Sequence, residues 1–249
     1  MSWFKRLLGE TGESEADRWL RRALEIYQKA SSGQIEMHEL EQGIQLCRKA
    51  ESVYQSLDKS GIEAECYNLE GSLHRFRHDL QAAIECHEKA LKIIHHISPE
   101  SESEGRCLNN LAELHRESYL PEPLADDHSI EHFIKALRYA VQACTIFQRK
   151  HPKSKLFALA LYHSGRICAE FGEVETAERI LSRARRLFAS VGDSILKHHC
   201  DMSLNSLKAC DVEMARKHRK LAEYLLKGRN DWEGVQHLLD TMRMIARER

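Results

Sequence analysis

The chain has 249 residues, of which 42% are hydrophobic and 30% are charged, and its formal net charge is −1. A near-zero net charge excludes a global electrostatic field that would attract nucleic acid or an anionic membrane. The sequence has no Cys-x-x-Cys pair among its eight cysteines, no secretory leader and no run of 18 apolar residues, which together predict a protein of the reducing cytoplasm.

The chain begins with the sequence MSWFKRLLG, in which four apolar residues lie on one stripe of a short helix beside two basic residues. The acidic, glycine-containing stretch 9–15 is expected to act as a linker. Two interpretations remain open: a segment that docks on a partner or a membrane surface, and a cap that packs on the first helical hairpin. We therefore separate an N-terminal segment, 1–16, from a helical region, 17–249. The candidate docking residues are Trp3, Phe4, Lys5, Arg6, Leu7 and Leu8.

Apolar periodicity and turn residues predict a series of helices and no strand. A loop with two prolines, SYLPEPLADDH, precedes Ser129, which we expect to cap a helix that starts at Ile130 and ends before Pro152. The predicted helices, in chain order, are 17–29, 39–58, 62–77, 80–97, 104–117, 130–150, 155–171, 174–191, 194–208, 212–227 and 232–249.

Small residues recur along these helices with a fixed spacing. A small residue is followed twelve positions later by Ala and seven positions after that by a second Ala, and two residues seven apart lie on one stripe of a helix. Such a stripe lets a neighbouring helix approach closely, so the spacing predicts stacked helical hairpins. The two clearest sets are Gly71, Ala83, Ala90 and Gly165, Ala177, Ala184. A weaker set is Ser203, Ala215, Ala222, and Ala112, Ala136, Ala143 form a set with twelve extra residues.

The segment 64–93, AECYNLEGSLHRFRHDLQAAIECHEKALKI, resembles a tetratricopeptide repeat (TPR), with Tyr67, Gly71 and a turn at His78-Asp79. The run CLNNLAELH at 107–115 resembles the first helix of kinesin light-chain repeats. The second-helix alanines Ala50, Ala90, Ala143, Ala184 and Ala222 are 40, 53, 41 and 38 residues apart, more than the usual repeat of about 34.

This longer spacing is similar to that of the subclass with kinesin light chain, LGN-type adaptors and the bacterial Rap regulators. The resemblance implies an all-α, right-handed superhelical solenoid of about five TPR-like hairpins, with the last helix, 232–249, as a C-terminal cap. The chain departs from the pattern at Gly43, where Ala is usual, and at an inserted loop, 126–129.

In a TPR solenoid the first helix of each hairpin lines the concave groove, and the resemblance implies which residues face it. An Asn amide can bond both the N–H and the C=O of an extended peptide, and an Arg can hold a carboxylate in a bidentate fork. The alternative is a solvated helix face with no ligand. The candidate groove residues are Asn68, Arg75, Asn109, Asn110, Glu113, Arg116, Tyr162, His163 and Arg166.

Other sites receive less support. His74 and His78 have the i, i+4 spacing that could place both on one metal ion. The sequence has no HExxH motif and no paired-cysteine motif, however. We therefore expect the 15 histidines to be surface or inter-helix residues. We predict no metal and no cofactor. The sequence also lacks a phosphate-binding glycine loop and a nucleophile motif, which argues against an enzyme. The basic run 216–220 is expected on a solvated outer helix face, with contact to phosphate or an acidic protein as the alternative.

The sequence thus predicts a protein-binding adaptor or scaffold that holds a protein or peptide segment in its groove. A regulator that changes conformation on binding a peptide, like the Rap proteins, is one alternative, and a metal-dependent enzyme is a remote one. Pentatricopeptide RNA readers have a related architecture, but the tightly spaced small residues and the neutral charge favour a protein partner over a nucleic acid. The sequence assigns no oligomeric state.

Overall fold

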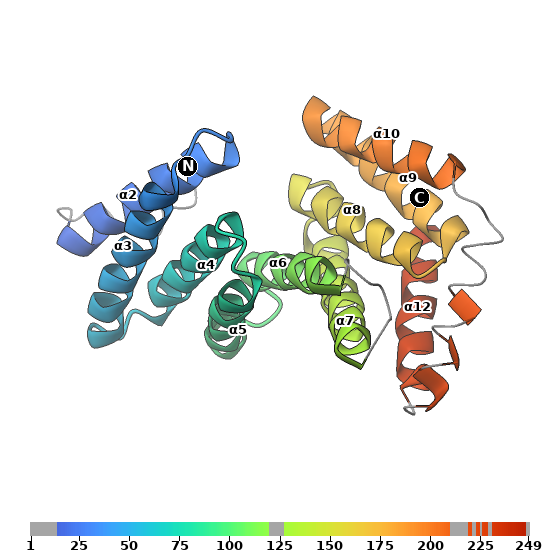
Figure 1. The fold of residues 1–249 in the computed structure, drawn as a ribbon, viewed down its shortest axis with the longest axis horizontal. Coiled ribbons are helices and arrows are strands. Elements are labelled where there is room, and N and C mark those ends of the chain that lie inside the picture. The colour runs from blue at the N-terminus through green and yellow to red at the C-terminus, as the bar shows by residue number, and fades with distance from the viewer. Residues whose placement is uncertain are drawn as a thin grey trace. The chain divides into compact units, whose positions relative to one another are not determined.

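The computed structural model describes residues 14–119, 127–209, 219–220, 223–224, 226–228 and 231–247. Each element in these ranges is an α-helix (Figure 1), and the all-α prediction is therefore confirmed for them. The chain divides into two compact units, Met1–Cys107 and Leu108–Arg249, which we describe separately. The division of the chain at residue 16 into a segment and a helical region stays a prediction. Among the described residues, none of the helices is long and apolar enough to cross a bilayer.

Helix boundaries follow the sequence prediction closely. The helix predicted at 80–97 is found with those ends, and the ends of the other described helices either coincide with the prediction or differ from it by one to three residues. The prediction that Ser129 caps a helix starting at Ile130 is wrong: the helix begins at Asp127 and Ser129 lies within its first turn, buried. The helix predicted at 212–227 falls mostly outside the described residues. The helices are α2 Glu15–Ser31, α3 Met37–Ser56, α4 Ser60–Phe76, α5 Leu80–Ile97, α6 Glu102–Tyr119, α7 Asp127–Lys150, α8 Lys155–Glu170, α9 Val174–Ser190, α10 Ser194–Ala209 and α12 Trp232–Arg247.

The first unit stacks α2, α3, α4 and α5 in chain order, each against the next (Figure 1). A capping box formed by Ser14 and Asp17 starts α2, and Asp17 also accepts a hydrogen bond from the buried hydroxyl of Tyr54 on α3. Packing explains why residue 43 is glycine rather than the alanine that is usual in the repeat. A Cβ at Gly43 would lie 3.0 Å from Cδ1 of Leu73 and 3.1 Å from Cγ2 of Ile26.

In the second unit α8 packs against α7 and α9, α10 packs against α9, and the C-terminal helix α12 packs against α7 and α9. The hydroxyl of Ser154 caps α8 by accepting a hydrogen bond from the backbone N–H of Phe157. Gly172 turns the chain from α8 into α9 with a φ of 83°, a backbone conformation that favours glycine. Large apolar side chains fill much of the interior of this hairpin, and Phe157, Leu181 and Phe188 are fully buried.

In the two clearest sets, the predicted small residues lie where the two helices of a hairpin are in close contact. Gly71 matches Gly165 by a constant shift of 94 residues, and Ala83 and Ala90 match Ala177 and Ala184 by the same shift. All four alanines have no exposed surface. A Cβ on Gly71 would lie 2.8 Å from Cδ2 of His87, and a Cβ on Gly165 would lie 2.7 Å from Cγ of Leu181. The spacing found in the sequence therefore marks where the two helices of each hairpin touch.

Candidate functional site

Glu113 on α6 is the centre of a buried ion network in the second unit. Its side chain is 3% exposed, and it accepts hydrogen bonds from Nε and Nη2 of Arg116 on the same helix at 2.8 and 3.0 Å. Two groups of α8 also contact it: Nδ1 of His163 at 2.8 Å and Nη1 of Arg166 at 2.9 Å. The network therefore joins the first helices of two successive repeats.

A second carboxylate completes the network. Glu170, near the end of α8, accepts hydrogen bonds from Nη1 of Arg116 at 2.7 Å and from the hydroxyl of Tyr119 at 2.6 Å. Burial alone would raise the pKa of Glu113, but the adjacent His163 and Arg116 hold it well below its usual range. For Glu170 the effect of burial prevails and the pKa is raised, despite its contact with Arg116. The two carboxylates thus share one buried guanidinium but differ in pKa.

These contacts divide the predicted groove residues of the second unit into a buried set and an accessible set. Glu113, Arg116 and Asn109 are at most 5% exposed, and His163 is 8% exposed. The guanidinium of Arg116 is bound on both sides by Glu113 and Glu170, so it acts within the fold as a bridge between α6 and α8. The accessible residues, all of them half-buried, are Asn110, Tyr162 and Arg166.

The two accessible α8 residues form a pair. The guanidinium carbon of Arg166 lies 5.4 Å from the centre of the Tyr162 ring, within cation–π distance. The Arg166 side chain is 28% exposed, and its salt bridge to the buried Glu113 fixes one end of the guanidinium. This arrangement presents an aromatic ring and a positive charge on a rigid base.

The two predicted groove asparagines that occupy the same repeat position are both buried. Asn68 on α4 is 8% exposed, and its Oδ1 accepts a hydrogen bond from Nδ1 of His87 on α5 at 3.0 Å. Asn109 on α6 is 5% exposed, and its Oδ1 has no hydrogen-bond partner among the described residues. Arg75, one turn after Gly71 on α4, is half-buried. Whether any of these residues contacts a partner stays a prediction.

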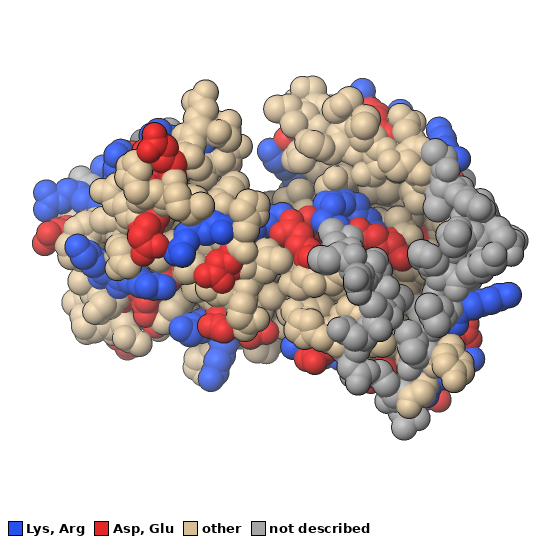
Figure 2. Space-filling view, viewed as in Figure 1, with Lys and Arg blue, Asp and Glu red and all other residues tan. Residues whose placement is uncertain are grey.

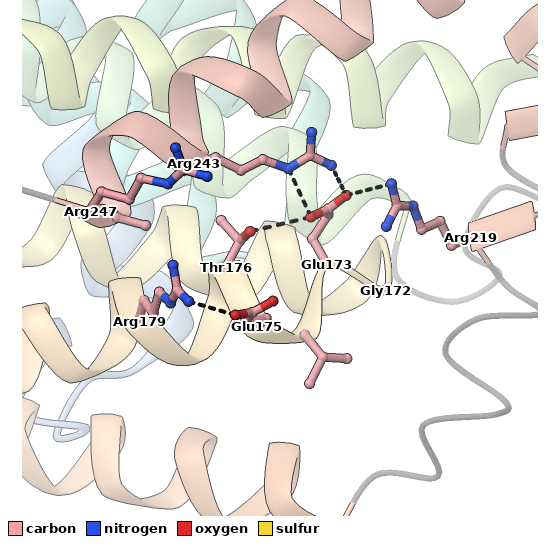
Figure 3. A pocket seen from close by; sticks show the side chains of 10 residues that line it. Gly172, Glu173, Glu175, Thr176, Arg179, Arg219, Arg243 and Arg247 are labelled. Carbon is pink, nitrogen blue, oxygen red and sulfur yellow. Dashed lines mark hydrogen bonds and ion pairs between the residues drawn. The ribbon is translucent and has the colours of Figure 1, made fainter.

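A pocket that the sequence did not suggest lies at the start of α9 (Figure 3). Glu173, 6% exposed, receives two hydrogen bonds from Arg243 of α12 and an ion pair from Arg219 at 3.0 Å. Arg179 contacts Glu175 on the rim. The pocket has a volume of about 490 Å³, and its remaining lining residues are Gly172, Val174, Thr176, Ala246 and Arg247. The Glu173–Arg243 contact spans 70 residues of sequence, so no local pattern could have revealed it.

Two predicted surfaces lie wholly or partly outside the described residues. The docking segment Trp3, Phe4, Lys5, Arg6, Leu7 and Leu8 is outside them, and so are residues 216–218 of the basic run. Of the rest of that run, Arg219 pairs with Glu173 and Lys220 is exposed. His74 and His78 do not share one helix face, because His78 lies in a turn beyond the end of α4, with a φ of 61°, and is not buried.

Comparison with known proteins identifies the fold. No family model matches the chain, and no curated protein matches it. A Podosopora anserina protein described as a putative kinesin light chain with nearly identical TPR-like repeats aligns over 94% of this chain and 97% of its own, at 14% identity and a TM-score of 0.56. A point variant of the same protein gives the same coverage and identity, with a TM-score of 0.57. BtubC (BKLC) from P. vanneervenii covers 94% and 91% of the two chains at 17% identity, with a TM-score of 0.48. The two alignments with TM-scores above 0.5 show that the chain has the TPR-like helical-repeat fold that the sequence predicted.

Proposed function

We propose that the protein is a protein-interaction scaffold, and that its second unit binds a partner segment along the face of α6 and α8. The TPR-like fold supports binding over catalysis, because stacked helical hairpins offer extended surfaces to other proteins. The observation that carries the proposal is the Tyr162–Arg166 pair. It is partly exposed and held on a buried ion network, the combination of rigid support and accessible chemistry that a binding surface needs.

The chemistry of this face favours an acidic segment. One nitrogen of the Arg166 guanidinium, Nη1, binds Glu113, and the exposed part of the fork can take a carboxylate from a partner. Tyr162 supplies a flat apolar ring beside it, and the half-buried Asn110 supplies an amide for the partner backbone. The buried Asn109, Glu113, Arg116 and His163 act as supports in this proposal. Arg75 and Asn68 are the corresponding candidates in the first unit.

Charge distribution favours a protein partner over nucleic acid. The formal net charge is −1, and positive and negative side chains are mixed over the face shown in Figure 2. A continuous positive surface, which phosphate backbones require, is not visible on that face among the described residues. We also place the protein in a reducing cytoplasm, since its seven described cysteines are buried free thiols. For the segment 1–16, docking and capping both remain proposals.

The test selects a displayed random-peptide library on the full-length protein. We expect enrichment of peptides that carry acidic residues next to an apolar one. The selected peptides should bind Arg166→Ala with an affinity about 10–100-fold lower, which corresponds to the free energy of one hydrogen bond to a charged group. Arg179→Ala is the matched control, because Arg179 is also a partly exposed, ion-paired arginine of the second unit but lies in the α9 pocket. Equal losses in both variants would contradict the α6–α8 site, and no enrichment would contradict the scaffold function.

A further inference from the structure

Three side chains with metal-binding chemistry meet between α4 and α5, in the first unit. Glu70 and His74 are one turn apart on α4, Cys86 lies on α5, and their ligand atoms are all within 4.8 Å of one another. Each of the three is at least 93% buried. We propose that Glu70, His74 and Cys86 form a transition-metal site, best suited to Zn²⁺, that joins α4 to α5. This inference is independent of the proposed function.

The environment of His74 is the strongest argument for this site. Its side chain is 4% exposed, and neither ring nitrogen makes a hydrogen bond to a described residue. The nearest acceptors are Oε1 of Glu70, 3.5 Å from Nε2, and Oδ2 of Asp79, 3.6 Å from Nδ1. A buried polar atom without a partner costs about 1–3 kcal/mol, so an imidazole with two such atoms is expected to have a use. A metal on Nε2 would supply the missing partner.

Two neighbouring side chains are placed to orient the proposed ligands. Arg48 of α3 donates a hydrogen bond from Nε to Oε1 of Glu70 at 2.7 Å, the carboxylate oxygen that also lies nearest Nε2 of His74, and so orients the carboxylate. Asp79 faces Nδ1 of His74, opposite the nitrogen that faces Glu70. A carboxylate on the far nitrogen of a metal-binding histidine orients the ring and selects its tautomer. Two of the three ligands thus have a group in place to orient them.

The donor set selects the class of metal. One thiolate, one imidazole and one carboxylate suit Zn²⁺ and its transition-metal neighbours, whereas Mg²⁺ and Ca²⁺ prefer oxygen ligands alone. Zn²⁺ binds sulfur at about 2.3 Å and nitrogen or oxygen at about 2.0–2.2 Å in a tetrahedron, which places the donors roughly 3.5 Å apart. The donors lie within 4.8 Å of one another, so binding would draw them closer by up to about 1.3 Å. A water molecule would take the fourth position.

The other clear hairpin shows that the repeat itself does not need these residues. With the shift of 94 that matches Gly71 to Gly165, the positions of Glu70, His74 and Cys86 are occupied in α8 and α9 by Ser164, Cys168 and Ile180. Those three residues are also buried, and Ser164 is satisfied by hydrogen bonds to Ala160 O and to Cys144. The same backbone can therefore pack with no ionisable carboxylate or imidazole at these positions, and the cluster in α4 and α5 is an addition to the fold.

The site is tested with the purified, chelator-treated full-length protein, titrated with Co²⁺ alone and then with Zn²⁺. We expect one equivalent of Co²⁺ to bind with a thiolate-to-cobalt charge-transfer band, and one equivalent of Zn²⁺ to displace it. Cys86→Ala should lose the band and His74→Ala should lose tight binding. Cys66→Ala is the matched control, because Cys66 is a fully buried thiol on α4 outside the cluster, and it should keep both.

A milder variant guards against loss of folding. Asp79→Asn keeps a good N-cap for α5, since an Asn oxygen can still accept the hydrogen bond from the Ala82 N–H, but it removes the carboxylate opposite His74. We expect it to weaken metal affinity by about 10–100-fold with unchanged helical content. A wild-type protein that shows no charge-transfer band would overturn the proposal. So would a band that survives in Cys86→Ala or disappears in Cys66→Ala.

Discussion

The hairpins α4–α5 and α8–α9 share one repeat pattern but have different interiors. In α8–α9 the glycine of the first helix faces Leu181 and Ile180, which are both apolar and fully buried. In α4–α5 the equivalent glycine faces the ring of His87, whose Nδ1 donates to Asn68, and Glu70 and His74 are buried nearby. The small residues fix how closely the helices approach, while the side chains that fill the remaining space can be polar or apolar.

This difference has a physical consequence for stability. Burial of an apolar side chain stabilises a hairpin at any pH, whereas a buried ionisable group stabilises it only while its partners and its charge state are maintained. The interface between α4 and α5 should therefore respond to pH and to metal more than the interface between α8 and α9 does. Variants that remove single buried groups test how far the stability of each region depends on buried charge.

The largest effect is expected where α8 borders the network of Glu113. Glu113→Ala should lower the free energy of unfolding by about 3–5 kcal/mol, because it leaves the buried Arg116 with Glu170 as its remaining carboxylate. Urea denaturation followed by circular dichroism measures the change. The control is Glu175→Ala, whose side chain is 79% exposed, and which should stay within about 0.5 kcal/mol. A loss below about 1 kcal/mol for Glu113→Ala would show that the network does not hold α6 against α8.

A smaller change is expected in the pH dependence of the unfolding free energy, and it should differ between the two hairpins. Burial, with a contribution from the charge of Arg75, lowers the pKa of His87 to about 3. The unfolded chain, with a histidine pKa of about 6.5, then binds more protons than the folded chain, so stability falls as the pH drops from about 6.5 toward 3. Between pH 7 and pH 5 His87 should account for a loss of about 2 kcal/mol.

The variant His87→Leu copies the residue that α9 has at this position and should remove this loss. The measurement is the difference in unfolding free energy between pH 7 and pH 5 for the wild type and for the variant, in which all other titrating groups are common. Leu181→Met, a change in the apolar hairpin, is the control and should keep the wild-type pH dependence. Identical pH dependence in His87→Leu and the wild type would contradict a buried neutral His87.

The smallest expected change in stability is that of the two glycine variants, which double-mutant cycles compare. Gly71→Ala and Gly165→Ala should each destabilise by about 1 kcal/mol, since overpacking costs about 1–3 kcal/mol and the better helix propensity of alanine returns about 1 kcal/mol. In a Leu181→Ala background the cost of Gly165→Ala should disappear, because the close contacts of its Cβ at 2.7 and 2.9 Å are both with that side chain.

The first hairpin should behave differently in the same cycle. In a His87→Ala background Gly71→Ala should keep part of its cost, because the Cβ would still lie 3.1 Å from the backbone oxygen of Ala83, which cannot rotate away. Thermal and urea denaturation of the four variants of each cycle give the coupling energies. Equal coupling in both hairpins would indicate that the backbone contact is relieved by a small helix shift.

Much of the fold could be predicted from local patterns. Turns at His78-Asp79 and Gly172-Glu173, and the helix end before Pro152, depend on nearby residues and are found where predicted. The prediction for Ser129 was wrong because serine can also lie in the first turn of a helix, and the sequence around it does not distinguish the two places. The accessible part of the site was less predictable: repeat position identified Arg116 and Arg166 alike as groove residues, but the structure buries the first and leaves the second partly exposed.

The sequence by itself determined the class of fold, because helix periodicity and the spacing of Gly71, Ala83 and Ala90 are local consequences of helix geometry and close packing. Only the tertiary structure decided which polar side chains are covered, because their partners come from other helices: Glu170 reaches Arg116 across 54 residues, and Cys86 comes within reach of His74 only when α5 folds back on α4. Burial and ion pairing depend on distances between segments, which no single-helix pattern contains.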